Sequence, residues 1–288
     1  MFNIIEKRKI ILAIPCVILL VGIICFAVFG GFNSDIDFTG GTAMEIELGV
    51  NFDETAIRKT FSSVKGVEVS SVQSSGAQKA IVKTKELSQD KLVELKSAVT
   101  RDFPSSTITS VDSVSATMGQ DMWWSAAKSI LIAVILMLVY ISIRFDLFSG
   151  LSAVIALSHD VLMMLSVYAI FQLPINSTFI AAVLTILGYS INATIVVFDR
   201  VRENSKLIRK EAFASVVNKS IWQTMMRSIN TSVTTLLTLI CLYILGVTSI
   251  KHFAFPLIIG VVCGTFSSVF VAGQFWVIFK GKKAYAKQ

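Results

Sequence analysis

Six long apolar runs constrain this chain more than any other feature of its sequence. A helix needs about 20 predominantly apolar residues to cross the hydrocarbon core of a bilayer. Six segments meet this requirement: residues 10–29, 123–143, 148–170, 177–198, 229–248 and 253–279. Only 16% of the residues are charged and 54% are hydrophobic, which is typical of a protein whose solvent is a lipid bilayer. The sequence therefore predicts a polytopic α-helical membrane protein with six transmembrane helices.

All four cysteines lie inside these apolar runs, at positions 16, 25, 241 and 263. A disulfide framework or a thiolate metal site needs cysteines outside the hydrocarbon core, with partners at suitable spacing. We therefore expect these cysteines to pack as small apolar side chains. The sequence indicates no metal and no cofactor.

Positive charge is concentrated at one end of the expected helices. Basic residues occur at 7–9, at 144, between 200 and 210, and between 280 and 287, whereas the loops 172–176 and 246–250 carry no charge. Lys and Arg favour the cytoplasmic side, so we expect the N-terminus, residues 1–9, and the tail, residues 280–288, to be cytoplasmic. The positive residues flank spans instead of forming a folded basic face, so no nucleic-acid partner is expected.

Residues 30–122 differ in character from the rest of the chain. They hold 9 Lys and Arg against 13 Asp and Glu, which gives a net charge of −4. Because the whole chain has a net charge of +7, the remaining residues carry a net charge of +11. Strand-like alternation appears at 43–48, 67–73, 79–84 and 107–114, with a turn at Ser74-Ser75-Gly76, and helical periodicity follows Asp53 and Ser88. The order β-α-β-β-α-β predicts a ferredoxin-like α+β extracytoplasmic domain.

The chain has the plan of half a transporter. One span is followed by a large exterior domain and then by five further spans, residues 123–279. Transporters often pair two related halves around a site in the membrane, so we expect a second, similar chain. Within the five-helix bundle, residues 200–228 mix apolar and basic side chains. This pattern predicts a cytoplasmic amphipathic helix lying at the lipid interface.

Two motifs carry a family resemblance: DIDFTGGT at Asp35–Thr42 and GYSINATIVVFDRVREN at Gly188–Asn204. With Arg144-Phe145 and Ser158-His159-Asp160, they resemble the SecF family, a relative of RND-type transporters, over essentially the whole chain. The resemblance implies a non-enzymatic subunit in the bacterial inner membrane that pairs with a SecD-like subunit beside the SecYEG channel. It further implies that the protein, surrounded by membrane lipids, uses the proton gradient to help exported, unfolded polypeptides complete translocation.

The first motif has two interpretations. Asp35, Asp37, Gly40 and Gly41 could form an ion-binding turn, because glycines let the backbone approach a ligand closely. A tight turn from the first span into the first strand, with a capping carboxylate, requires the same residue types. We favour the turn.

His159 and Asp160 lie well inside the third span, where an ionised carboxylate costs at least about 2.5 kcal/mol. A proton relay is one interpretation, because histidine titrates near neutral pH. A hydrogen bond that packs neighbouring helices is the other. The sequence does not separate the two.

Arg227 and Thr231 lie one helical turn apart at the start of the fifth span, so they share a face. The resemblance implies a place in the family's proton pathway, and a snorkelling arginine is the alternative. Asn192 is a further polar candidate in the fourth span, next to Ala193, where the family commonly has an aspartate that carries protons. Three explanations would account for Ala193. Proton coupling could run through Asp160 or the partner subunit, the chain could conduct no protons, or the alanine could have been introduced deliberately.

Asp199 and Arg200, at the cytoplasmic end of the fourth span, are expected to form ion pairs that fix the helix end. Two other classes of function compete with a role in export. An RND-like exporter half for small molecules or lipids has the same plan but usually a second half. An intramembrane aspartyl protease would need Asp160 and Asp199 to meet, but they are expected at depths on the order of 15 Å apart.

Overall fold

The computed structural model describes residues 3–49, 52–74, 78–207 and 211–281. The chain divides into two compact units. Residues 1–33 and 128–288 form a helical membrane unit, and residues 34–127 form an α/β unit.

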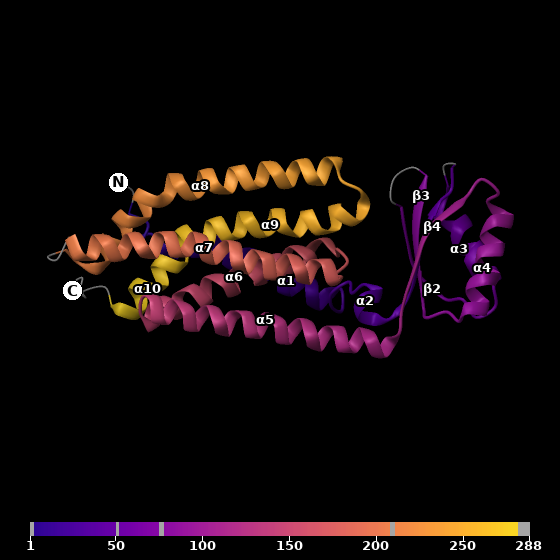
Figure 1. The fold of residues 1–288 in the computed structure, drawn as a ribbon, viewed down its shortest axis with the longest axis horizontal. Helices are drawn as coiled ribbons and strands as arrows, with labels where there is room; N and C mark the ends of the chain where they lie inside the picture. Colours follow the sequence, from indigo (N-terminus) through magenta and orange to yellow (C-terminus); the bar gives the residue numbers. More distant parts are fainter. Residues whose placement is uncertain (1–2, 50–51, 75–77, 208–210, 282–288) are drawn as a thin grey trace. The chain divides into compact units, whose positions relative to one another are not determined.

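The membrane unit consists of long, mostly apolar helices, shown in Figure 1. They are α1 (Arg8–Val28), α5 (Ala116–Arg144), α6 (Leu147–Phe171), α7 (Ser177–Leu207), α8 (Phe213–Leu245), α9 (Thr248–Phe270) and α10 (Ala272–Lys280). By length and composition, the described residues contain six helices able to cross a membrane, with α9 and α10 together forming the sixth. The prediction of six membrane-spanning helices is confirmed.

The helices differ in how they meet their surroundings. α6 and α9 bury small residues such as Ala153, Ala156 and Ser267, whereas α1 and α5 expose large apolar side chains such as Ile23 and Leu136. Apolar side chains on the outside of a bundle match lipid tails, and small residues inside it allow helix backbones to approach. The polar chemistry of the unit therefore concentrates where α6, α7 and α9 meet.

The segment 200–228 differs from the expected interfacial helix. Residues 200–207 continue α7, and residues 213–228 begin α8, so the described parts belong to two long helices; 208–210 lie outside the described residues. The apolar side of the start of α8 is buried, with the Phe213 ring 5.2 Å from that of Trp276 in α10. An apolar stripe covered by protein looks the same in sequence as one covered by lipid.

The α/β unit contains one antiparallel sheet with two helices packed on it. Its elements are α2 (Ile36–Thr39), β1 (Gly41–Glu47), α3 (Glu54–Ser63), β2 (Val69–Ser74), β3 (Lys79–Thr84), α4 (Gln89–Asp102) and β4 (Thr107–Val114). The strand order is β2-β3-β1-β4. This is the ferredoxin-like arrangement that the sequence predicts. Of the expected turn at 74–76, residues 75 and 76 lie outside the described residues.

Alternation along the strands builds the core of this unit. Met44 pairs with Val82 across β1 and β3, and both side chains point to the buried face together with Ile46. Phe61 of α3 and Leu95 of α4 cover that face. Period-two burial on the strands and helical periodicity on α3 and α4 therefore meet in one hydrophobic core.

The helix α5 begins at Ala116, seven residues before the apolar run starts at position 123. Its first turns lie in the α/β unit, where Gly119 packs against the backbone of Phe38 so closely that a Cβ atom would lie 2.8 Å from the Phe38 carbonyl oxygen. The ring of Trp123 lies 4.6 Å from that of Phe38. These contacts extend the helix beyond the hydrophobic stretch.

Candidate functional site

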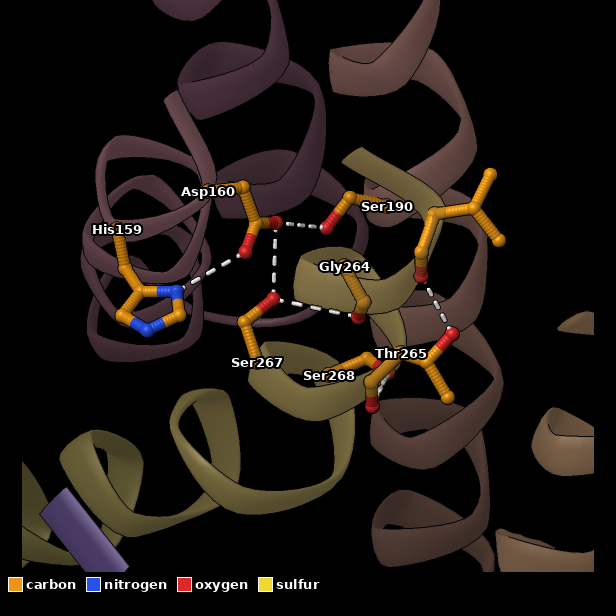
Figure 2. Close-up of polar contacts among 8 residues, drawn as sticks. His159, Asp160, Ser190, Gly264, Thr265, Ser267 and Ser268 are labelled. Atoms are coloured by element: carbon orange, nitrogen blue, oxygen red, sulfur yellow. Dashed lines mark hydrogen bonds and ion pairs between the residues drawn. The ribbon is translucent and has the colours of Figure 1, made fainter. Parts of the chain in front are cut away.

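Asp160 is the most enclosed charged group among the described residues of the membrane unit. Its side chain is fully buried on α6, and it accepts hydrogen bonds from Ser190 of α7 at 2.5 Å and from Ser267 of α9 at 2.8 Å. His159 Nδ1 lies 3.0 Å from the other carboxylate oxygen. Figure 2 shows these three partners converging on the carboxylate. One acidic side chain thereby links three helices.

Close helix packing brings these groups together. A Cβ atom on Gly264 of α9 would lie 3.1 Å from the Cβ of Ser190, which shows how near α9 runs to α7. At Gly260, one turn earlier, a Cβ would lie 2.4 Å from Ile186. Small residues at an interface let backbones approach, and short serine side chains can then reach the carboxylate.

His159 connects the carboxylate to a groove on the side of the bundle. Its ring is stacked on Phe266 with centroids 5.9 Å apart, and its side chain is 10% exposed. The second ring nitrogen, Nε2, is buried and has no hydrogen-bond partner among the described residues. The groove has a volume of about 170 Å³ and is lined by α1, α6 and α9.

A second polar cluster joins α7, α8 and α9. Tyr189 donates to the Ser232 hydroxyl at 3.0 Å, and Thr265 bonds to the same hydroxyl at 2.6 Å. Ser232 itself donates to the Ser228 carbonyl one turn back. Hydroxyl networks of this kind join helices in place of apolar contacts.

The other expected proton-relay residues meet beside this cluster. Arg227, Thr231, Asn192 and Ala193 line one cleft of about 190 Å³, together with Tyr189. Among the described residues, no carboxylate lies within ion-pair distance of Arg227. His159 and Asp160 do not line this cleft. The candidates therefore fall into two separate groups, one around Asp160 and one around Arg227.

Ser267, Ser232 and Thr265 belong to these clusters, although the sequence alone does not single them out. Ser267 and Ser232 are buried and Thr265 is half-buried, each within a span, and hydroxyl residues are common packing residues in membrane helices. Ser267 contacts Asp160 of α6, and Thr265 of α9 contacts Ser232 of α8, and these contacts depend on tertiary structure. A weak signal exists in the repeated small residues of α9 around Gly260 and Gly264.

Ion pairs occupy the end of α7. Arg144 lies 3.4 Å from Asp199, and Arg200 bonds to Glu203 at 2.8 Å and to Gln223 of α8 at 2.7 Å. Asp199 and Asp160 thus have different partners. Because α7 continues to Leu207, these contacts lie about two turns before the end of the helix, where they join α7 to α5 and α8.

The first motif forms a turn with a capping carboxylate. Asp35 accepts from the Ile36 N–H at 2.7 Å at the start of α2, and it also pairs with Lys83 of β3 at 2.8 Å. Asp37 lies in the first turn of α2, and Gly40 has a φ of 71°. Gly41 has a φ of 137°, and a Cβ there would lie 2.5 Å from the Thr84 carbonyl oxygen. Both glycines are needed for the backbone path into β1.

The chain is similar to proteins of known name over nearly its whole length. Residues 94–282 match the family described as "Protein export membrane protein SecD/SecF, C-terminal". The chain is 37% identical to the protein translocase subunit SecF of Alicyclobacillus acidocaldarius, covering 98% of this chain and 94% of that protein. It is 36% identical to SecF of Acidaminococcus fermentans over 98% of each chain. A crystal structure of SecDF from Thermus thermophilus, titled a translocon-associated membrane protein, matches with a TM-score of 0.87 at 32% identity, covering 97% of this chain and 38% of that one.

Proposed function

The chain belongs to the SecD/SecF family of protein-export membrane proteins, and from this premise we propose that it acts as a SecF-like subunit promoting protein export across the bacterial inner membrane. The observation that carries the proposal is the match over nearly the whole chain to proteins named SecF. The fold similarity to SecDF supports it. The protein acts as an accessory to the translocase instead of as an enzyme.

The arrangement of charge supports an orientation with both termini in the cytoplasm. The Ile4 N–H bonds to Asn218 near the start of α8, and Lys280 at the end of α10 pairs with Asp146 at the start of α6. Arg144, the last residue of α5, pairs with Asp199, about two turns before the end of α7. This end of the bundle is rich in Lys and Arg, as cytoplasmic ends are. Residues 1–9 and 280–288 are then cytoplasmic, and residues 30–122 are extracytoplasmic.

A SecD-like subunit is the proposed partner. The Thermus thermophilus match is named SecDF, and this chain covers 38% of it, which leaves room for a SecD half in the same polypeptide. Transporters of this plan pair two related halves, so a SecD-like half is expected to complete the assembly. The assembly would act beside the SecYEG channel on exported unfolded polypeptides.

The exposed face of α8 supports contact with that partner. Thr231, Thr234 and Thr238 follow Arg227 along one side of the helix, and their hydroxyls bond to carbonyls within α8. Among the described residues, the Arg227 guanidinium has no hydrogen-bond or ion-pair partner, and an arginine within a membrane span costs about 2.5 kcal/mol or more. A protein surface covering this face, instead of lipid, would remove that cost.

Coupling to the proton gradient is part of the proposal. Its support is the presence of charged or ionisable side chains at two positions in the membrane unit, Asp160 with His159 and Arg227 with its cleft. Buried ionisable residues in membrane spans are costly and are usually retained for a function.

Export and partnership are tested together in membrane vesicles. The full chain, carrying a purification tag, is expressed with its SecD-like partner, and the vesicles are assayed for completed translocation of a secretory precursor. We expect the partner to co-purify and export to rise above that of vesicles lacking the chain. A chain that binds no SecD-like partner and leaves export unchanged would contradict the proposal and favour a small-molecule or lipid exporter half.

A further inference from the structure

Lys251 is an exception to the charge pattern of the membrane unit. It lies in the first turn of α9, directly after the uncharged loop 246–250, at the end of the bundle opposite to the basic residues that flank the spans. Among the described residues, no carboxylate lies within ion-pair distance of its ammonium group. A half-buried cation at the membrane surface without a counter-charge in the chain favours an anion from outside it.

Lys251 lines a cavity of about 180 Å³ together with aromatic and polar side chains. Tyr168 of α6 and Tyr243 of α8 form part of its wall, and His252 and Phe255 continue along α9. The rings of Tyr243 and Phe255 lie 5.7 Å apart. Lysine, histidine and tyrosine side chains can all donate hydrogen bonds to a phosphate oxygen, and tyrosine is common at the level of lipid headgroups. The cavity therefore has the chemistry of a phosphate site at the membrane surface.

Two apolar grooves lie further along α9, one on each side of a ridge. The ridge consists of Val262 and Phe266, which line both grooves. The larger groove, of about 310 Å³, lies between α8 and α9, and the smaller is the groove of about 170 Å³ between α1, α6 and α9. In the larger groove the hydroxyls of Thr265 and Ser232 bond to each other. The accessible walls of both are apolar, so they suit hydrocarbon chains instead of a polar ligand.

The cavity and the grooves are spaced as the parts of one phospholipid. Lys251, Phe255 and Val262 follow one another at intervals of four and seven residues, which places them on one face of α9. Val262 lies about 16 Å from Lys251 along the helix axis, at 1.5 Å per residue. One leaflet contributes about 15 Å of hydrocarbon, which is half of a core of about 30 Å. A lipid with its phosphate at Lys251 therefore has chains long enough to reach the ridge.

The larger groove lies on a different side of α8 from the proposed partner contact. Leu236 lines the groove and follows Arg227 by nine residues, which is about two and a half helical turns. The two side chains therefore leave α8 on opposite sides. Because the SecD-like partner is proposed to cover the side of Arg227, the groove remains open to the bilayer.

We infer that this face of α9 binds one anionic phospholipid with two acyl chains. Its phosphate lies in the cavity beside Lys251, and one chain lies in the groove on each side of the ridge of Val262 and Phe266. The inference goes beyond the proposed function and rests on it only for the leaflet. With both termini in the cytoplasm, the lipid belongs to the extracytoplasmic leaflet.

The lipid is detected by titrating the purified full chain in a neutral detergent with dioleoylphosphatidylglycerol and counting retained lipids by native mass spectrometry. Dioleoylphosphatidylcholine, which has the same chains and no net charge, is the comparison. We expect one phosphatidylglycerol to be retained per chain, with an affinity about tenfold higher than that of phosphatidylcholine, because a lysine–phosphate pair is a charge-assisted contact. Equal retention of the two lipids would overturn the assignment of an anionic headgroup.

Two lysine variants test the position of the headgroup. Lys251→Gln removes the cation and should lower the affinity for phosphatidylglycerol about tenfold, to that for phosphatidylcholine. Lys128→Gln is the matched control, because Lys128 is exposed on α5 and does not line the cavity. Equal losses in both variants would show an unspecific attraction between charges and would overturn the site.

Two tryptophan variants test the position of the chains. Leu236→Trp narrows the larger groove, whereas Leu237→Trp adds the same ring at a neighbouring position that is 59% exposed and does not line the groove. We expect Leu236→Trp to weaken retention of the dioleoyl lipid severalfold and to leave the short-chain dihexanoylphosphatidylglycerol unchanged. Leu237→Trp should change neither. If Lys251→Gln fails to fold, this pair still decides, and equal retention in both would overturn the groove assignment.

Other occupants give different results. If inorganic phosphate protects the full chain against thermal unfolding as well as phosphatidylglycerol does, the cavity takes a free anion and the lipid assignment is overturned. If the SecD-like partner displaces the lipid and Leu236→Trp weakens partner binding, the groove belongs to the partner, which also overturns it. Lipid retention without partner binding or export would remove the proposed function alone, and export without lipid retention would remove this inference alone.

Discussion

The hydroxyl of Ser267 donates to Asp160 across 2.8 Å and joins α9 to α6 over a separation of 107 residues. Ser190 brings α7 to the same carboxylate oxygen. The two serine hydroxyls donate to one carboxylate oxygen and so join α6, α7 and α9 at one point. The bond therefore contributes to the packing of the membrane unit and also supplies a hydrogen-bond donor to the buried Asp160 carboxylate.

Removing this bond should destabilise the helix bundle. We expect Ser267→Ala to lower the free energy of unfolding by about 0.5–2 kcal/mol, because a buried carboxylate loses one of its donors. Thermal unfolding of the detergent-solubilised full chain measures the change. Ser268→Ala, which keeps the Asp160 contacts, provides the comparison; equal losses in both variants would show that the carboxylate bond adds nothing of its own.

The close packing of α9 on α7 predicts a steric effect at Gly260. A Cβ there would lie 2.4 Å from the side chain of Ile186, so Gly260→Leu should cost about 1–3 kcal/mol through overpacking. At Gly188 of α7, a Cβ would have no neighbouring atom within 4 Å, and Gly188→Ala should be neutral or slightly stabilising. Resistance to unfolding by denaturing detergent measures both. Similar behaviour of the two variants would contradict the packing.

Much of the fold follows from periodicity in the sequence. Continuous apolar runs predict the spans, and the alternation around Met44 and Ile46 predicts a strand with one buried face. The continuation of α8 back to Phe213 was not predictable, because its apolar side is covered by α10 and its pattern resembles that of a helix covered by lipid.

The candidate site was predictable only in part. Asp160 and Arg227 stand out because charge is rare inside membrane spans. Ser267 and Ser232 do not stand out, since their importance comes from helices that meet only in the folded chain. Residue type identified the groups that carry charge, and tertiary structure was required to identify their hydrogen-bond donors.

Two lysines of the α/β unit should respond differently to substitution. Lys83 pairs with Asp35 at 2.8 Å, and these side chains are only 12% and 15% exposed, whereas Lys85 and Glu68 form a pair that is 73% and 69% exposed. Lys83→Gln leaves a nearly buried carboxylate unpaired and should cost about 1–3 kcal/mol. Lys85→Gln should have no measurable effect. Hydrogen exchange of strand β3 in the full chain reports both, and equal protection in the two variants would contradict the role of burial.

Acid should weaken the α/β unit through Asp102. The Arg101 side chain and the Thr60 hydroxyl both donate to this carboxylate at 2.9 Å, and they hold the pKa of Asp102 below its usual value. A folded-state pKa below the unfolded value stabilises the unit above about pH 4, and this contribution is lost as the pH falls through the folded pKa.

Thr60→Val tests this contribution, because it removes one of the two donors. We expect the pKa of Asp102 to rise toward its unfolded value and the acid-dependent loss of stability to become smaller, as measured by carboxyl NMR and by unfolding of the full chain. Ser63→Ala is the control, since Ser63 bonds to the Thr60 carbonyl and not to a carboxylate. An unchanged Asp102 titration in Thr60→Val would rule out the hydroxyl as a cause.

The cleft around Arg227 predicts the effect of placing a carboxylate at position 193. Ala193 lines this cleft with Arg227, so Ala193→Asp would place a carboxylate where the guanidinium lacks a described counter-charge. We expect export in vesicles containing the SecD-like partner to gain severalfold in dependence on the proton gradient. Ala193→Asn, which is similar in shape but does not titrate, should show no gain.

Two further variants locate coupling in the chain as it stands. If export by the original chain already depends on the gradient, Asp160→Asn should abolish that dependence while Arg227→Ala reduces it less, because the proton is then bound between α6 and α9. The opposite order would place coupling in the Arg227 cleft, with the titrating carboxylate supplied by the partner subunit. In a third outcome, export by the original chain does not depend on the proton gradient, and export by the Ala193→Asp variant does. This result would mean that the alanine has uncoupled the subunit, so that Asp160 does not drive export.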